Sequence, residues 1–210
     1  MKLIREIGKY CRSVTAIVMI TTALCTSAQP TTTLPIGEEQ VVYQMIGEFL
    51  NSGAAHMQYG YFTSVAGLNS VFSSTSTKDE TTALVTFVTT ATNTQVANHG
   101  PFRIVNRAGK TTIYLNNGPS NFADPASFSQ GTPIQKSDFT QQVILNTATN
   151  AFVTIHTNTI TSVQTFTLDG TSYRLGQPGK SFRTNYSGQA NAPGVVPSGY
   201  FAGTSTGSKN

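Results

Sequence analysis

The chain has 210 residues, 38% of them hydrophobic and only 10% charged, with a formal net charge of +4 and no Trp. The length leaves room for about one domain. Four of the 13 basic residues lie within the first 12 positions, and the chain beyond position 28 carries nine basic and eight acidic residues, a net charge of +1. This balance argues against an extended cationic surface, so we expect no nucleic-acid partner.

The first 28 residues have the three-part layout of a secretory signal peptide. A basic stretch is followed by a 13-residue apolar run from Ser13 to Cys25, and the small residues Thr26, Ser27 and Ala28 suit a cleavage site. The apolar run is too short for a bilayer-spanning helix, which needs about 20 residues. We therefore predict a secreted (periplasmic or extracellular) protein with no stable membrane insertion after cleavage. The mature chain is then free of cysteine and of disulfides.

The remaining chain divides by composition into three parts. Residues 29–37 are polar and bounded by Pro, which indicates a linker, and residues 38–176 carry the patterned segments of a single β-domain. Residues 177–210 are crowded with Gly, Pro and Ser. Because such a composition offers little apolar surface to bury, we predict a mostly disordered tail there.

The first predicted strands follow the linker. Residues 42–50 would also give an apolar helix face, but the Val-Val-Tyr run and the interior Gly47 favour a strand. Residues 56–65 form the next strand, in which Gly60 marks a bulge or a close approach of backbones. Residues 82–91 alternate apolar and Thr side chains with a period of two.

Further strands are predicted in the second half of the domain. The ranges 102–106, 112–116, 139–146 and 151–168 are rich in β-branched and aromatic residues. Residues 107–110 have the length and the Gly of a hairpin loop between the first two. The pair Asp169–Gly170 is a strong hairpin signal, since type I′ turns need positive φ at both central residues.

Together these segments predict an all-β fold with little helix. About eight short strands joined mostly by hairpins favour an antiparallel up-and-down β-barrel. The long connection from Gly118 to Pro133 would also suit a β-sandwich, which we keep as the alternative.

Few residues offer catalytic chemistry. Ser-nucleophile elbows are absent, and the Gly109-Lys110-Thr111 stretch lacks the upstream Gly and the strand-to-helix context of a phosphate loop. An acid/base enzyme would have to use Glu48, His56 and His156, converging in the mouth of the barrel with perturbed pKa values. The histidines show no short metal-ligand spacing, so we predict no metal and no cofactor.

The aromatic residues suggest the function that we favour. Inside a barrel they could line a mostly apolar cavity for a small ligand. The candidate lining residues are Tyr59, Tyr61, Phe62, Phe87, Phe102 and Tyr114. The sequence therefore favours a non-catalytic exported domain that binds a small apolar or amphipathic ligand or plays a structural role beside an envelope or extracellular partner. The enzyme is the alternative.

Overall fold

A computed structural model describes residues 30–34 and 41–207 of the chain. The predicted signal peptide lies outside the described residues. The described part is nearly all strand, with a single 3₁₀ helix. Its elements are β1 (Thr31–Leu34), β2 (Val41–Ser52), β3 (Ala55–Val65), β4 (Val85–His99), β5 (Phe102–Leu115), η1 (Pro125–Ser129), β6 (Thr132–Asn146), β7 (Ala151–Val163), β8 (Phe166–Leu168), β9 (Thr171–Leu175), β10 (Ser181–Ala190) and β11 (Gly199–Gly207).

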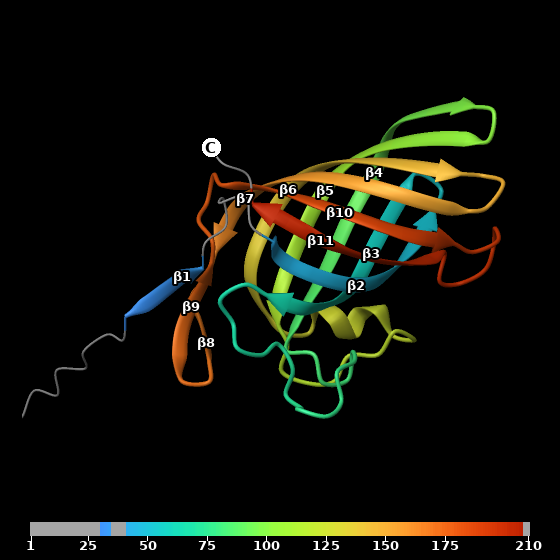
Figure 1. The fold of residues 1–210 in the computed structure, drawn as a ribbon. Coiled ribbons are helices and arrows are strands. Elements are labelled where there is room, and N and C mark those ends of the chain that lie inside the picture. Colours follow the sequence, from blue (N-terminus) through green and yellow to red (C-terminus); the bar gives the residue numbers. More distant parts are fainter. Residues whose placement is uncertain (1–29, 35–40, 208–210) are drawn as a thin grey trace, which may run out of the picture.

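Eight of these strands form a closed antiparallel barrel (Figure 1). Each barrel strand pairs with the next one along the chain, and β11 pairs with β2 to close the ring. The predicted up-and-down barrel is confirmed, and the sandwich alternative is wrong. Four hairpin turns, β2–β3, β4–β5, β6–β7 and β10–β11, gather at one end, at the right in Figure 1. We call this the open end and the opposite one the closed end.

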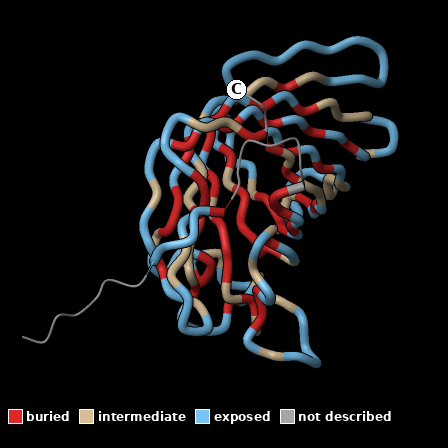
Figure 2. Tube along the Cα trace, turned by 60° about the vertical axis from the view of Figure 1, so that its left-hand side comes forward, coloured by how far each residue is buried: buried red, intermediate tan, exposed pale blue. Residues whose placement is uncertain are grey.

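The period of two places alternate side chains inside the barrel. Along β7, Phe152, Thr154, His156 and Asn158 are buried, while the residues between them are exposed. Figure 2 shows this alternation of buried and exposed positions along the strands. Because inward positions carry polar as well as apolar residues, the interior is only partly a hydrophobic core.

Interior glycines let neighbouring strands and rings approach closely. A Cβ added to Gly60 would lie 2.1 Å from the carbonyl oxygen of Ile46, so only glycine fits there. The close approach predicted at Gly60 is confirmed. Gly47, its partner on β2, lies under the ring of Phe201, and Gly188 lies under the ring of Phe152.

The predicted disordered tail is wrong. Residues 181–190 and 199–207 form β10 and β11, so the β-domain does not end at residue 176. The physical reason is a period-two pattern within the Gly-rich composition. Phe182, Thr184 and Tyr186 point inward and are buried, and β10 pairs along its length with both β7 and β11.

The predicted hairpin at residues 107–110 is also wrong. These residues lie in the middle of β5, which pairs continuously with β4 and β6. The turn lies earlier, between His99 and Phe102, where Gly100 has a φ of 54°. Gly109 serves close packing instead, because a Cβ there would lie 2.1 Å from the carbonyl oxygen of Thr90.

A small second sheet lies at the closed end (Figure 1). Asp169 and Gly170 have φ values of 49° and 75° and join β8 to β9, which confirms the predicted turn. β1 adds to β9 in parallel. Residues 31–34 are therefore a strand rather than part of a linker, and the rest of the predicted linker, apart from Pro30, lies outside the described residues.

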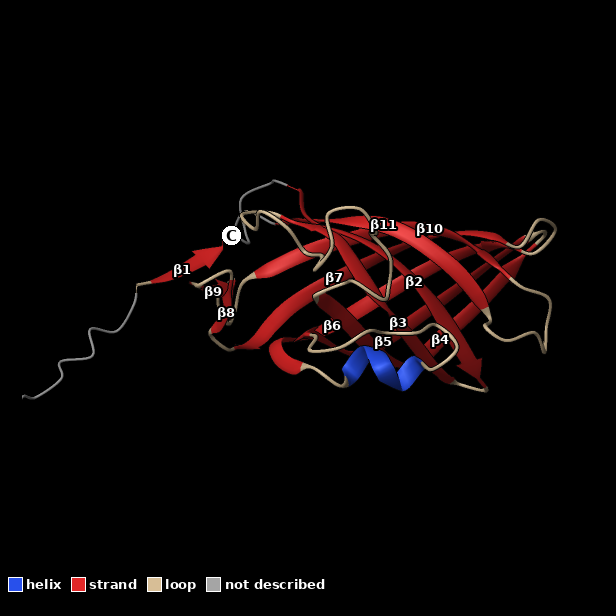
Figure 3. Ribbon diagram, turned by 90° about the horizontal axis from the view of Figure 1, so that it is seen from below, coloured by secondary structure: helices blue, strands red, loops and turns tan. Residues whose placement is uncertain are grey.

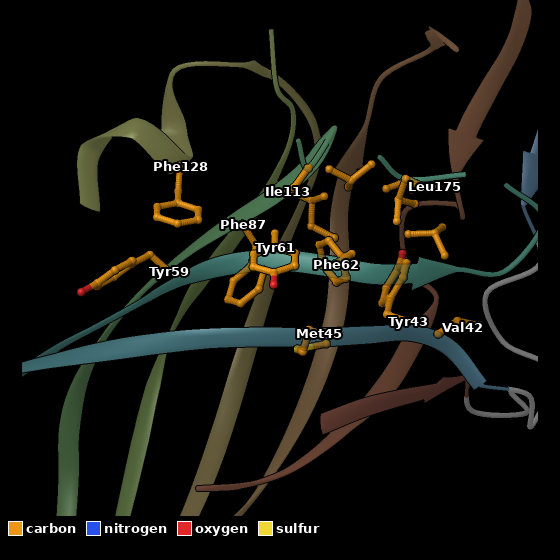
Figure 4. Close-up of a cluster of buried hydrophobic side chains, with 14 of the residues drawn as sticks. Val42, Tyr43, Met45, Tyr59, Tyr61, Phe62, Phe87, Ile113, Phe128 and Leu175 are labelled. Carbon is orange, nitrogen blue, oxygen red and sulfur yellow. The ribbon is translucent and has the colours of Figure 1, made fainter. Parts of the chain in front are cut away.

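The connection from β5 to β6 packs against the outer face of the barrel, with η1 at its centre (Figure 3). Phe128 contacts the ring of Tyr59 at a centroid distance of 5.5 Å, and Phe122 contacts that of Tyr61 at 6.2 Å. In Figure 4, Tyr59 and Phe128 lie together, apart from Tyr43 and Val42. The long connection therefore covers an apolar part of the outer face. Within residues 30–34 and 41–207, no helix has the length and apolarity to cross a membrane.

Candidate ligand site at the open end of the barrel

Midway along the interior, four buried polar side chains form what we call the central polar cluster: Gln58, Gln141, His156 and Tyr186. The side-chain amides of Gln58 and Gln141 donate to the Tyr186 hydroxyl oxygen. That hydroxyl in turn donates to Nε2 of His156 at 2.8 Å. Phe139 stacks on the His156 ring, with centroids 4.6 Å apart and planes inclined by 6°. The four side chains are therefore paired with one another and, through Oε1 of Gln141, with Arg107, as a buried network requires.

Both interior histidines are neutral at physiological pH. Burial, together with the positive charge of Arg107, lowers the pKa of His156 to about 3. Burial, Arg107 and His156 lower the pKa of His56 to about 2. In the opposite direction, burial raises the pKa of Tyr186 to about 12. The interior therefore disfavours additional positive charge, because desolvation and Arg107 act together.

His56 has a defined tautomer, fixed by Asn51. Nδ1 of His56 lies 2.7 Å from Oδ1 of Asn51, and Nη2 of Arg107 donates to the same oxygen at 3.4 Å. Since a guanidinium only donates, the Asn51 atom is an acceptor, and Nδ1 of His56 must carry the proton. Nε2 is then a bare acceptor, and it is buried without a hydrogen-bond partner.

Arg107 projects from β5 into the open half of the barrel. Its Nε donates to Oδ1 of Asn93 at 2.9 Å, and its Nη1 donates to Oε1 of Gln141 at 3.2 Å. With Asn51, all of its protein acceptors are neutral amide oxygens. Burial lowers the pKa of Arg107 to about 10, which leaves it fully charged at pH 7.

Two connected hollows meet at Arg107. The inner cavity has a volume of about 70 Å³ and is walled by Phe49, His56, Val143 and Phe152. The outer one, which we call the vestibule, has a volume of about 410 Å³ and reaches the β10–β11 connection at residues 191–198. The two share the following lining residues: Asn51, Val105, Arg107, Leu145 and Ala190. The two hollows therefore adjoin one another between the β10–β11 connection and the central polar cluster.

Of the three residues expected to form an acid/base site, the structure brings two into the interior. His56 and His156 both point inward, whereas Glu48 lies on the outer face and accepts from the Tyr59 hydroxyl at 3.0 Å. Burial is the main cause that raises the pKa of Glu48. The barrel wall therefore separates this carboxyl from the histidines.

The six aromatic candidates do not meet in one cavity. Tyr59 and Tyr61 lie on the outer face beneath the β5–β6 connection. Phe62 and Phe87 pack against each other inside the closed half, at a centroid distance of 5.3 Å. Phe102 is half exposed on the outside, and Tyr114 alternates outward from the buried Ile113. The open-end hollows are lined by other residues.

A larger hollow, about 810 Å³, lies on the outer face and is lined in part by Ile46, Phe102, Val153 and Tyr200. These four side chains are exposed, and the polar groups among its lining do not converge on an unpaired atom. Although it is wider, this groove offers less specific chemistry than the two adjoining hollows. Within the described part of the chain, no group of three His, Cys, Asp or Glu is placed to hold a metal ion.

Sequence reasoning missed Arg107, Gln58, Gln141 and Tyr186. Arg107 fell in the predicted loop at 107–110, and Tyr186 fell in the predicted tail. The missed signal is the alternation itself, because Arg107 stands two positions from Val105 in an uninterrupted β-rich run. No protein-family model, curated protein or solved structure shows significant similarity to this chain.

Proposed function

We propose that this protein is an exported, non-catalytic carrier that binds a small amphipathic molecule through the open end of its barrel. One observation carries the proposal. The inner cavity holds a buried histidine nitrogen, Nε2 of His56, that has a free lone pair and no partner. A buried polar atom left without a partner costs about 1–3 kcal/mol, so its presence favours a ligand that supplies a donor.

The dimensions of the two hollows support the same class of ligand. The vestibule, at about 410 Å³, falls within the size range of small-molecule sites, which begins at about 300 Å³, and the inner cavity adds about 70 Å³. Phe49, Val143 and Phe152 supply apolar walls, and the polar groups come from neighbouring side chains of the same lining, among them His56 and Arg107. An amphipathic molecule matches this division.

The enzyme alternative has less support from the geometry. His56 and His156 have pKa values of about 2 and 3, which makes them weak general bases at neutral pH. Glu48 lies across the barrel wall from both. A carrier needs neither group to transfer a proton.

Blocking the two hollows tests the proposal. The probe is 4-methylphenol, a small neutral amphipathic molecule, observed by saturation-transfer NMR on the mature chain. Ala190 lines both hollows, so Ala190→Trp should abolish the transfer, whereas Ala202→Trp on the outer face of β11 should preserve it. Val195→Trp narrows only the vestibule, and it serves if the first variant unfolds.

Removing the free acceptor tests the observation on which the proposal depends, the unpartnered Nε2 of His56. His56→Phe keeps the ring and deletes the lone pair, so 4-methylphenol should bind about tenfold more weakly. His99→Phe on the exposed end of β4 is the matched control and should bind like wild type. Equal binding to all of these variants, or none to the wild type, would refute the carrier proposal.

A further inference from the structure

Arg107 carries a positive charge that no carboxylate of residues 30–34 or 41–207 pairs with. Among the described residues the structure forms one ion pair, Lys110 with Asp138 at 2.7 Å, and both of its side chains are well exposed on the outside. Arg107 contacts only the neutral oxygens of Asn51, Asn93 and Gln141. Arg107 is half-buried, and removing part of a cation from water without a counter-charge is costly, so this arrangement favours an anion from outside the described residues.

The remaining described carboxylates are placed away from the open half. Asp79 and Glu80 belong to the β3–β4 connection, Asp124 caps η1, Asp169 forms the β8–β9 turn, and Glu48 accepts from Tyr59 on the outer face, so all five lie toward the closed end or on the outer face. Arg103 also lines the vestibule and adds a second positive charge near Arg107. The approach to the inner cavity is therefore electropositive.

Arg107 also has donors to spare. A guanidinium offers five N–H groups in a planar fork, and three of them are used by the amide oxygens. It stands where the vestibule meets the inner cavity, and it shares Asn51 with His56. A ligand that passes this point meets the cation first, the free acceptor on His56 next and the ring of Phe152 beside them.

We propose that the ligand of the open end is a small organic carboxylate, whose carboxylate group pairs with Arg107 while a hydroxyl group at its other end donates to Nε2 of His56 in the inner cavity. The inference rests on the proposed function and adds the chemical class. Carboxylate geometry matches the arginine fork, and charge-assisted bonds of this kind are about twice as strong as neutral ones.

A pair of probes that differ only in charge tests the inference. 4-Hydroxyphenylacetate and 4-hydroxyphenylacetamide have almost the same shape, and their affinities are measured by titration calorimetry. The acid should bind at least about tenfold more tightly than the amide, because the acid alone pairs with the guanidinium. Its affinity should fall with added salt, whereas that of the amide should not.

Arg107→Gln should abolish the difference in affinity between the acid and the amide. Arg183→Gln, on the outer face of β10, is the matched control and should keep it. Inorganic phosphate in place of the acid checks for a general anion site, and displacement of the acid by phosphate at equal concentration would overturn the assignment to a carboxylate.

The two proposals fail differently. If 4-methylphenol binds and Ala190→Trp blocks it, but the acid and the amide bind wild type equally, the carrier stands and the carboxylate inference falls. If the acid preference survives in Arg107→Gln, the role of Arg107 is wrong. If neither probe nor 4-methylphenol binds, both proposals fall. The comparison in the wild type needs no variant, so it holds even where Arg107→Gln does not fold.

Discussion

The two halves of the barrel interior use the same eight strands for opposite purposes. In the closed half, Tyr43 meets the rings of Phe62 and Phe182 at 5.0 and 5.6 Å, and Gln135 donates to its hydroxyl. In the open half, the inward positions hold His56 and Arg107 beside the inner cavity. The closed half is packed around aromatic rings, whereas the open half contains the inner cavity; buried polar atoms without a hydrogen-bond partner lie in both, Oε1 of Gln135 in the closed half and Nε2 of His56 in the open half. The difference indicates that stability is concentrated at the closed end, which frees the open end for binding.

The largest loss of stability is expected from removing an aromatic ring from the closed half. Phe87 is buried and packs against Phe62 and Phe201, so Phe87→Ala should lower the free energy of unfolding by about 3–5 kcal/mol. Phe102→Ala, at a half-exposed site on the rim of the open end, should cost less than about 0.5 kcal/mol. Urea unfolding measures both, and similar losses would contradict a packed closed half.

The boundary between the halves is the central polar cluster. Tyr186→Phe deletes the hydroxyl that accepts from Gln58 and Gln141, and it should cost about 1–3 kcal/mol because the buried Gln58 amide loses its acceptor while Gln141 keeps His156. Tyr200→Phe, on the exposed outer face, should leave stability unchanged. Thermal unfolding of the two variants decides whether the hydrogen bonds of this network contribute to stability or only the packing of the ring does.

Acid should weaken the open half. His56 and His156 have folded-state pKa values of about 2 and 3, below the ordinary value of 6.5, so only the unfolded chain takes up their protons as the pH falls below about 6.5. Each histidine should then lower the free energy of unfolding by up to about 1.4 kcal/mol per pH unit. The raised pKa of Glu48 opposes this trend at lower pH. His56→Gln should flatten the dependence of the free energy of unfolding on pH between pH 6.5 and 5, as measured by urea unfolding at each pH.

The smallest effect on stability is expected from a substitution on the outside of β5, the strand that carries Arg107. Lys110 pairs with Asp138 in full contact with solvent. Lys110→Ala should change the free energy of unfolding by less than about 0.5 kcal/mol, because exposed ion pairs contribute little. A loss above 1 kcal/mol in urea titration would show that this pair helps to hold β5 against β6.

The strands of the barrel were predictable where the period-two pattern lay in segments that are not rich in Gly and Ser. The strand at 56–65 and the turn at Asp169–Gly170 were found from alternation and turn chemistry. The same alternation in 181–190 was hidden by Gly and Ser, which composition alone assigns to disorder. Gly188 and Gly199 are there because a ring and a carbonyl of neighbouring strands occupy the space of a side chain, and such long-range contacts leave no local signal.

The candidate site was only partly predictable. Mid-strand positions made His56 and His156 candidates for the interior, and both lie there. The direction in which Glu48 points depends on the strand register, and a shift of one residue reverses it. Arg107 was lost because Gly109 suggests a turn when its neighbours are unknown, whereas its partner on β4 makes it a close-packing site.

Closure of the barrel by β11 on β2 has a kinetic consequence. The paired residues Phe49 and Gly199 are 150 positions apart. Every other barrel pairing joins two barrel strands that are consecutive along the chain. Loop-closure entropy makes such a distant contact slow to form. Until β11 has been synthesised and docked, β2 and β10 present long unpaired edges that can recruit strands from other chains. The final strand therefore controls both the folding rate and the window in which the nascent protein is prone to aggregate.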